Sequence, residues 1–343
     1  MSYQVVVKRE CMHNERTDTS IDLENIYCHV PAVTCSGPLR IHTDYPVIDE
    51  RNANWVRKFL PFPDEEARLR FLGHRYSMLD TMMFPSGSGE RIWQISCVTS
   101  MFFAIDDLSL LQQVLPGDIA SGLADEHPYS RAFSDIWGIL SRSMPTTLYR
   151  RYSRHWQLWF DSVLRENELK EQGKILDMDA YLALRRANVG ALTYMIFAEY
   201  LHDLDFSDYA DDPDLMRAQQ AVEEYCLLVN DLYSYRKECS AGQGFNILAS
   251  LTRLHGLSMQ QAVDVVCARI SAADQLRKEL CDLLYDRYSS LFDTEQLQTY
   301  LNTLGTICAG VLRWTLESPR YECDDYRWEW KRTREITVSL PSL

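Results

Sequence analysis

The chain has 343 residues, a formal net charge of −14, and 46% hydrophobic and 11% aromatic residues. This charge disfavours binding to nucleic acid or to an anionic membrane, so any site for a phosphorylated ligand has to be a local basic pocket. No stretch reaches the roughly 18 apolar residues of a membrane-spanning helix. The ten cysteines form no C-x-x-C pair, which indicates reduced, mostly buried thiols. We therefore expect a cytoplasmic protein with no nucleic-acid partner and no membrane anchor.

Helical periodicity continues through most of the chain. The helices that it predicts cover residues 52–60, 64–82, 90–107, 130–142, 145–172, 178–201, 214–239, 258–290 and 294–317. No pair of strands is predicted, so the expected fold class is all-α. We expect one helical domain at residues 51–325, an irregular segment at 1–50 that wraps around it, and a tail at 326–343.

The most informative stretch is residues 229–238, which carries Asn230, Ser234 and Glu238 at intervals of four. On a helix these side chains form a column on one face, about 6 Å apart along the axis. Amide, hydroxyl and carboxylate oxygens are the donors that Mg²⁺ prefers. Lys237 stands beside Glu238 and is placed to meet an anion that the metal carries. The alternative interpretation is a capped helix end with a surface ion pair.

Two further elements accompany this column. The predicted helix 90–107 has an apolar stretch that ends in Asp106 and Asp107, where the helix dipole favours cations, and a divalent ion would offset the two acids. After the helix that Pro319 stops, Arg320 and Tyr321 lie in a loop that can close over a site. An arginine fork and a tyrosine hydroxyl are suited to binding phosphate.

In this order and spacing, the three elements resemble the class I terpene synthases of microbial type, a family of sesquiterpene cyclases. That family has an aspartate-rich motif after two phenylalanines, an N-D-x-x-S-x-x-x-E metal motif and a terminal Arg-Tyr pair. The middle motif matches in full, and the resemblance covers about residues 30–325. It implies a single-domain helical bundle around a central active-site cavity.

The resemblance also implies roles for individual residues. The metal ligands would be Asp106, Asp107, Asn230, Ser234 and Glu238. The substrate diphosphate would be bound by Arg186, Lys237, Arg320 and Tyr321. Aromatic faces stabilise a carbocation, and Phe102, Phe103 and Trp314 are the candidates, with ordinary core packing as the alternative. Gly190 would break its helix and expose a backbone carbonyl to the cation, or would be only a packing glycine.

One departure from the family pattern concerns the aspartate motif. The family usually has a third acid three or four residues after the second aspartate, where this chain has Leu110 and Leu111. Asp106 would then be the principal metal ligand and Asp107 a secondary one. The departure puts metal affinity in doubt, rather than the class of reaction.

The activity that the resemblance implies is Mg²⁺-dependent ionisation and cyclisation of a linear prenyl diphosphate. Three Mg²⁺ ions are expected, with Mn²⁺ as a substitute, in a monomer or homodimer. Chain length favours farnesyl diphosphate, with geranylgeranyl diphosphate and a diterpene product as the alternative. A chain-elongating prenyl transferase or a squalene-synthase-like enzyme would carry paired aspartate motifs, and a helical scaffold would need no metal donors.

Overall fold

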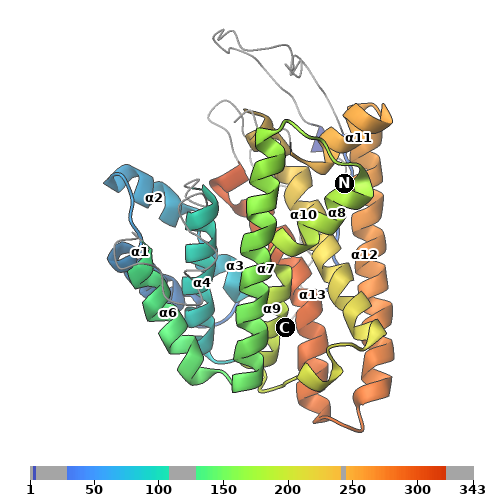
Figure 1. Cartoon of the computed structure of the whole chain (residues 1–343). Coiled ribbons are helices and arrows are strands. Elements are labelled where there is room, and N and C mark those ends of the chain that lie inside the picture. Colours follow the sequence, from blue (N-terminus) through green and yellow to red (C-terminus); the bar gives the residue numbers. More distant parts are fainter. Residues whose placement is uncertain (1–2, 5–28, 108–128, 241–244, 322–343) are drawn as a thin grey trace.

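The computed structural model describes residues 3–4, 29–107, 129–240 and 245–321. These residues form a helical bundle (Figure 1), which confirms the all-α expectation. The N-terminal half contains α1 (Tyr45–Phe59), α2 (Glu65–Gly73), α3 (Tyr76–Met83), α4 (Gly89–Asp107), α6 (Ser130–Ser143) and α7 (Thr146–Glu171). The second half contains α8 (Met178–Asn188), α9 (Ala191–Leu201), α10 (Pro213–Ser240), α11 (Ile247–His255), α12 (Met259–Tyr288) and α13 (Thr294–Glu317).

Short elements complete the described chain. The 3-10 turns η2 (Ser207–Tyr209) and η3 (Pro319–Tyr321) follow α9 and α13, respectively. Two short antiparallel strands, β1 (Tyr3–Gln4) and β2 (His29–Val30), pair within the segment that the sequence predicted to be irregular. Two residues per strand leave the fold class unchanged. Within the described residues, no helix has both the length and the apolar character needed to cross a bilayer.

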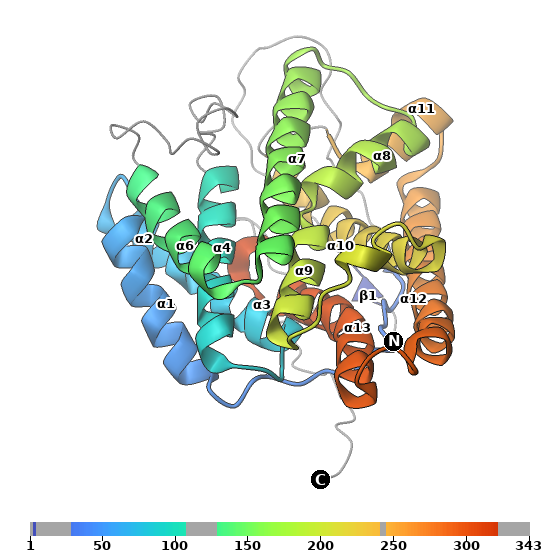
Figure 2. The same ribbon diagram turned by 60° about the horizontal axis from the view of Figure 1, so that its bottom comes forward.

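Helix α10 runs through the interior of the bundle, with α8, α9, α11, α12 and α13 packed against it (Figure 1). Its Leu227, Leu228 and Val229 are fully buried. Helices α1, α2, α4 and α6 lie on the side of the molecule away from α12, as both views show (Figure 1 and Figure 2). Helix α3 joins the two sides because it packs against both α4 and α13.

Several helix boundaries follow from local chemistry, and some differ from the prediction. Helix α1 begins seven residues earlier than expected, because Pro46 is accepted in a first turn. The predicted helix 64–82 is two helices, divided at Arg75, whose φ of 55° is left-handed. The predicted helix 178–201 is also divided, at Gly190 (φ 74°), the residue that was expected to break it. Helix α11 was missed, although Asn246 caps its start through the Leu248 N–H.

The crossing of α3 and α13 supports a stability prediction. A Cβ added to Gly310 on α13 would lie 2.7 Å from the Met83 backbone nitrogen on α3. Because backbone atoms cannot move aside cheaply, we expect Gly310→Ala to lower the free energy of unfolding by about 1–3 kcal/mol. Chemical denaturation measures this change.

The matched control is Gly73→Ala at the end of α2, where an added Cβ meets no atom within 4 Å. Its effect should stay within about 0.5 kcal/mol. Equal stability of the two variants would contradict the close packing of α3 on α13.

Candidate active site

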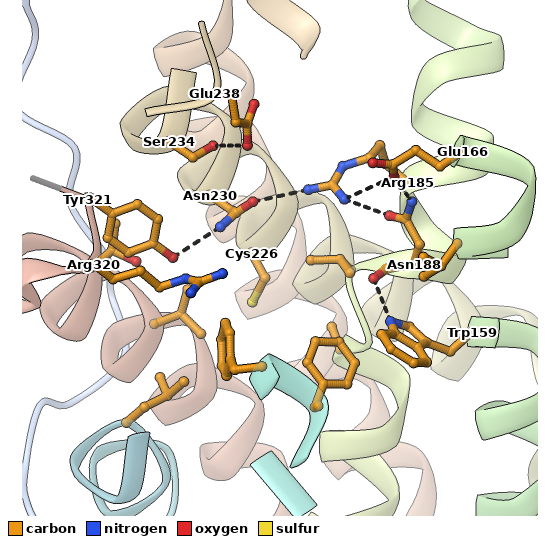
Figure 3. A pocket seen from close by; sticks show the side chains of 18 of the residues that line it. Trp159, Glu166, Arg185, Asn188, Cys226, Asn230, Ser234, Glu238, Arg320 and Tyr321 are labelled. Atoms are coloured by element: carbon orange, nitrogen blue, oxygen red, sulfur yellow. Dashed lines mark hydrogen bonds and ion pairs between the residues drawn. The ribbon is translucent and has the colours of Figure 1, made fainter. Parts of the chain in front are cut away.

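The polar column of α10 forms one wall of a cavity of about 590 Å³. Asn230, Ser234 and Glu238 all line this cavity and share one face of the helix (Figure 3). The Ser234 hydroxyl donates to Glu238 Oε1 at 2.6 Å, and the Asn230 amide donates to the Tyr321 hydroxyl at 3.1 Å. The i, i+4, i+8 spacing of the sequence therefore places three oxygen-bearing side chains side by side.

The electrostatic state of Glu238 suits a cation site. Burial, together with the nearby Asp231 carboxylate, raises the pKa of Glu238. A cation placed beside Glu238 would favour the ionised form and reverse this effect. The neighbouring Asn246 amide already donates to Glu238 Oε2 at 2.9 Å, which orients the carboxylate.

The donor set fits a hard divalent ion. Amide, hydroxyl and carboxylate oxygens suit Mg²⁺ or Mn²⁺, whereas zinc prefers nitrogen and sulfur donors. Among the described side chains, no group of three or more His, Cys, Asp or Glu residues is arranged to hold a metal. Since two of the three donors in the column are Asn and Ser, the column does not depend on such a group.

Asp106 and Asp107 are the last two residues of α4. Their side chains lie outside the part of the chain that the structure describes, as do Leu110 and Leu111. Phe102 and Phe103, four residues earlier, line the cavity. The last described side chains of α4 that face the cavity are therefore these two rings.

Arg185, rather than the expected Arg186, reaches the cavity from α8. Its guanidinium donates to Asn188 Oδ1 at 2.7 Å and to Asn230 Oδ1 at 3.1 Å (Figure 3). It also donates to Asp231 Oδ1 at 3.0 Å. Glu166 of α7 lies 3.7 Å from the same guanidinium. These contacts hold Arg185 beside Asn230, the first residue of the polar column.

Arg186 is absent from the cavity lining. Its guanidinium instead pairs with Glu224 at 3.1 Å, and Glu224 also pairs with Arg269 at 2.6 Å. One step along a helix turns a side chain by about 100°, which separates the two arginines. A sequence signal was available, because Tyr181, Arg185 and Asn188 are spaced by four and three and share one face.

Four residues of the site were missed by the sequence analysis: Glu166, Arg185, Asn188 and Asp231. Asp231 directly follows Asn230 and is almost fully buried. It accepts hydrogen bonds from the Tyr181 hydroxyl and from the Ile247 backbone N–H, the latter at 3.1 Å. Asp231 thus ties α10 to α8 and to the start of α11, and fixes the column from behind.

The C-terminal pair lies beside the polar column, since the Tyr321 hydroxyl accepts from Asn230. Arg320 and Tyr321 lie in η3, both are buried, and both line the cavity. The Arg320 guanidinium carbon lies 4.7 Å from the centroid of the Phe103 ring, and its Nη1 donates to the Tyr76 hydroxyl at 3.1 Å. Lys237 lines the same cavity from α10.

Aromatic rings form another part of the cavity wall. Phe102, Phe103 and Trp314 all line the cavity. The Phe103 ring lies 5.5 Å from that of Trp314, and the Phe102 ring lies 4.4 Å from that of Trp159. The cavity wall is therefore polar and cationic in one part and aromatic in another.

Gly190 lies at the junction of α8 and α9, and its neighbours Val189 and Ala191 line the cavity. The Gly190 carbonyl accepts the Thr193 N–H at 3.1 Å, so the structure gives this carbonyl a partner within the first turn of α9. A Cβ at this position would lie 2.8 Å from Phe102 Cε2. The placement of Gly190 therefore points to close packing under Phe102 in a left-handed backbone conformation.

Comparison with known proteins agrees with this arrangement. Residues 98–273, about half of the chain, match the family described as terpene synthase family 2, C-terminal metal binding. The chain belongs to this family. It is thus a class I terpene synthase of microbial type, an enzyme that acts on prenyl diphosphates.

Individual relatives span nearly the same length. The chain is 25% identical to (E)-2-epi-beta-caryophyllene synthase from Selaginella moellendorffii, over 91% of this chain and 92% of that protein. It is 23% identical to sesquiterpene synthase 1 from Postia placenta, over 84% and 87%. A solved structure, linalool/nerolidol synthase from Streptomyces clavuligerus, superimposes with a TM-score of 0.74 at 21% identity, covering 83% of this chain and all of the other.

The contact of Gly190 with Phe102 leads to the second prediction. In this terpene synthase, Gly190→Ala adds a left-handed alanine and pushes the Phe102 ring. We expect a loss of about 2–4 kcal/mol in the free energy of unfolding together with reduced turnover. Denaturation curves and steady-state assays measure the two effects.

Gly256, which follows α11, is the matched control, because its φ of 65° is also left-handed but a Cβ there meets nothing within 4 Å. Gly256→Ala should cost only the backbone strain, about 1 kcal/mol, and leave turnover unchanged. If both variants behave alike, the packing role of Gly190 is wrong.

Proposed function

We propose that this terpene synthase ionises farnesyl diphosphate in the presence of Mg²⁺ and cyclises the resulting cation to a sesquiterpene, with release of diphosphate. The observation that carries the proposal is the division of one cavity into a wall of oxygen donors and cations and a wall of aromatic rings. The volume of about 590 Å³ lies within the range of about 300–1,000 Å³ typical of small-molecule sites. Sesquiterpenes are C15 compounds, so the similarity to sesquiterpene synthase 1 from Postia placenta supports a C15 substrate.

The metal would be held by Asn230, Ser234 and Glu238 from α10 and by Asp106 and Asp107 from the end of α4. Three ions are proposed, with Mn²⁺ able to replace Mg²⁺. When bound, Mg²⁺ neutralises charge on the diphosphate and makes it a competent leaving group. The missing third acid after Asp107 is expected to weaken metal binding.

The diphosphate would be bound by Arg185, Lys237, Arg320 and Tyr321. Arg185 takes the place first expected for Arg186, because its guanidinium lines the cavity beside Asn230. These cations lie on the polar wall, so they would fix the charged end of the substrate there. The prenyl chain would then extend toward Phe102, Phe103 and Trp314.

The aromatic wall would serve the cation that forms when the diphosphate leaves. Ring faces attract a desolvated cation by roughly 0.5–2 kcal/mol each. Apolar side chains from α3 and α13 complete this half of the cavity: Leu79, Met83, Ile307 and Val311. Their exclusion of water would favour ring closure over quenching of the cation.

The experiment that tests the proposal is incubation of the full-length chain with C10, C15 and C20 prenyl diphosphates, with product analysis by gas chromatography and mass spectrometry. We expect cyclic C15 products from farnesyl diphosphate, no turnover after chelation with EDTA, and recovery on addition of Mg²⁺ or Mn²⁺. Cyclic C20 products alone would replace the substrate assignment. Products longer than the substrate would identify a prenyl transferase instead.

The assignment of the diphosphate-binding arginine has a matched pair of variants. Lysine keeps the charge but loses the forked geometry of arginine. We expect Arg185→Lys to lower kcat/KM about tenfold or more, since a charge-assisted bond to the substrate contributes roughly 1.5–3 kcal/mol. Arg186→Lys on the outer face of α8 should change kcat/KM less than about twofold.

Circular dichroism and thermal melting are the controls that show whether both variants fold. A larger loss in Arg186→Lys than in Arg185→Lys would restore the original assignment.

A further inference from the structure

A corner between α2 and α3 contacts the C-terminal side of the cavity, although none of its residues lines the cavity. It consists of His74, Arg75 and Tyr76, with Arg75 in the left-handed region at φ 55°. The His74 carbonyl accepts the Trp314 indole N–H at 2.9 Å and the Ser318 hydroxyl at 3.3 Å. The corner therefore holds both the end of α13 and the residue that precedes η3.

Tyr76 makes the more specific contacts. Its hydroxyl oxygen accepts Arg320 Nη1 at 3.1 Å and lies 2.9 Å from His74 Nδ1. Its ring is stacked on Phe103 with centroids 4.3 Å apart and an interplanar angle of 14°. Because the oxygen accepts from Arg320, its own proton is available to donate to His74 Nδ1. One buried residue behind the cavity thus touches a cation and an aromatic ring that line it.

We propose that Tyr76 is a positioning residue that holds Arg320 and Phe103 in a fixed relation before substrate binds. The inference rests on the proposed function, because it gives Arg320 a diphosphate to bind. A free arginine side chain has many rotamers, and ordering it on binding lowers affinity. The bond to Tyr76 engages one N–H of a guanidinium that carries five donors in all.

The stack adds a second constraint. Phe103 lies between the two functional halves, because Arg320 covers its ring at 4.7 Å and Trp314 lies beside it at 5.5 Å. Fixing Phe103 against Tyr76 therefore fixes the distance between the diphosphate-binding cation and the aromatic wall. Preorganised contacts of this kind act without reorganisation when the charge separates.

The test is a double-mutant cycle on the full-length chain, with inorganic diphosphate and Mg²⁺ titrated calorimetrically. Tyr76→Phe removes the hydroxyl and keeps the ring that packs on Phe103. We expect binding in the otherwise native chain to weaken about 5- to 20-fold, as for loss of a bond to a charged group. In an Arg320→Gln background the same change should alter binding less than about twofold.

Tyr200→Phe is the matched control. Tyr200 is also a buried tyrosine, its hydroxyl donates to Gln94 at 2.9 Å, and it does not line the cavity. The control should leave diphosphate binding unchanged, and melting temperatures of all variants report any general loss of stability.

The possible outcomes separate the two claims. If the native chain binds no diphosphate with Mg²⁺, the proposed function fails and this inference fails with it. If the native chain binds and Tyr76→Phe binds equally well, only the positioning role is overturned. The same conclusion follows if the loss persists undiminished in the Arg320→Gln background, because Tyr76 would then act independently of Arg320.

Discussion

The site depends on an ion pair buried between α8 and α10. Arg185 and Asp231 meet at 3.0 Å, and Asp231 is only 1% exposed. Burying two charges costs several kcal/mol per ion unless additional hydrogen bonds satisfy them. Here Tyr181 and the Ile247 N–H supply bonds to the carboxylate, while Asn188 and Asn230 accept from the guanidinium. The pair therefore joins three helices and fixes Asn230, the first residue of the polar column.

Positively charged side chains gather at this cavity, although the chain as a whole is acidic. The net charge is −14, yet Arg185, Lys237 and Arg320 converge on one cavity. Glu166, Glu171 and Glu238 line the same cavity and balance part of this charge, and Asp231 lies behind the column. A local basic pocket in an acidic protein binds a small anion with metal ions and disfavours extended polyanions.

Much of the fold follows from local patterns. Helices α4, α6, α7, α10, α12 and α13 start and end within about two residues of the expected positions, because caps and prolines act locally. Helix α11 was missed because nine residues carry little periodicity, and its start depends on Asn246. The division between α2 and α3 follows Gly73, but the left-handed residue is Arg75, whose conformation no local pattern predicts. Its left-handed conformation is maintained by the contacts that the corner makes with α13.

What the sequence by itself determined is the column of Asn230, Ser234 and Glu238, since spacing on one helix fixes a face. The sequence by itself also indicated the family, because the family's motifs are short and local. Only the tertiary structure showed that Arg185 rather than Arg186 lines the cavity, because this depends on which side of α8 packs against α10. It alone also joined Tyr76 to Arg320, 244 residues apart. Contacts between distant segments are set by the packing of whole helices, and no local pattern records them.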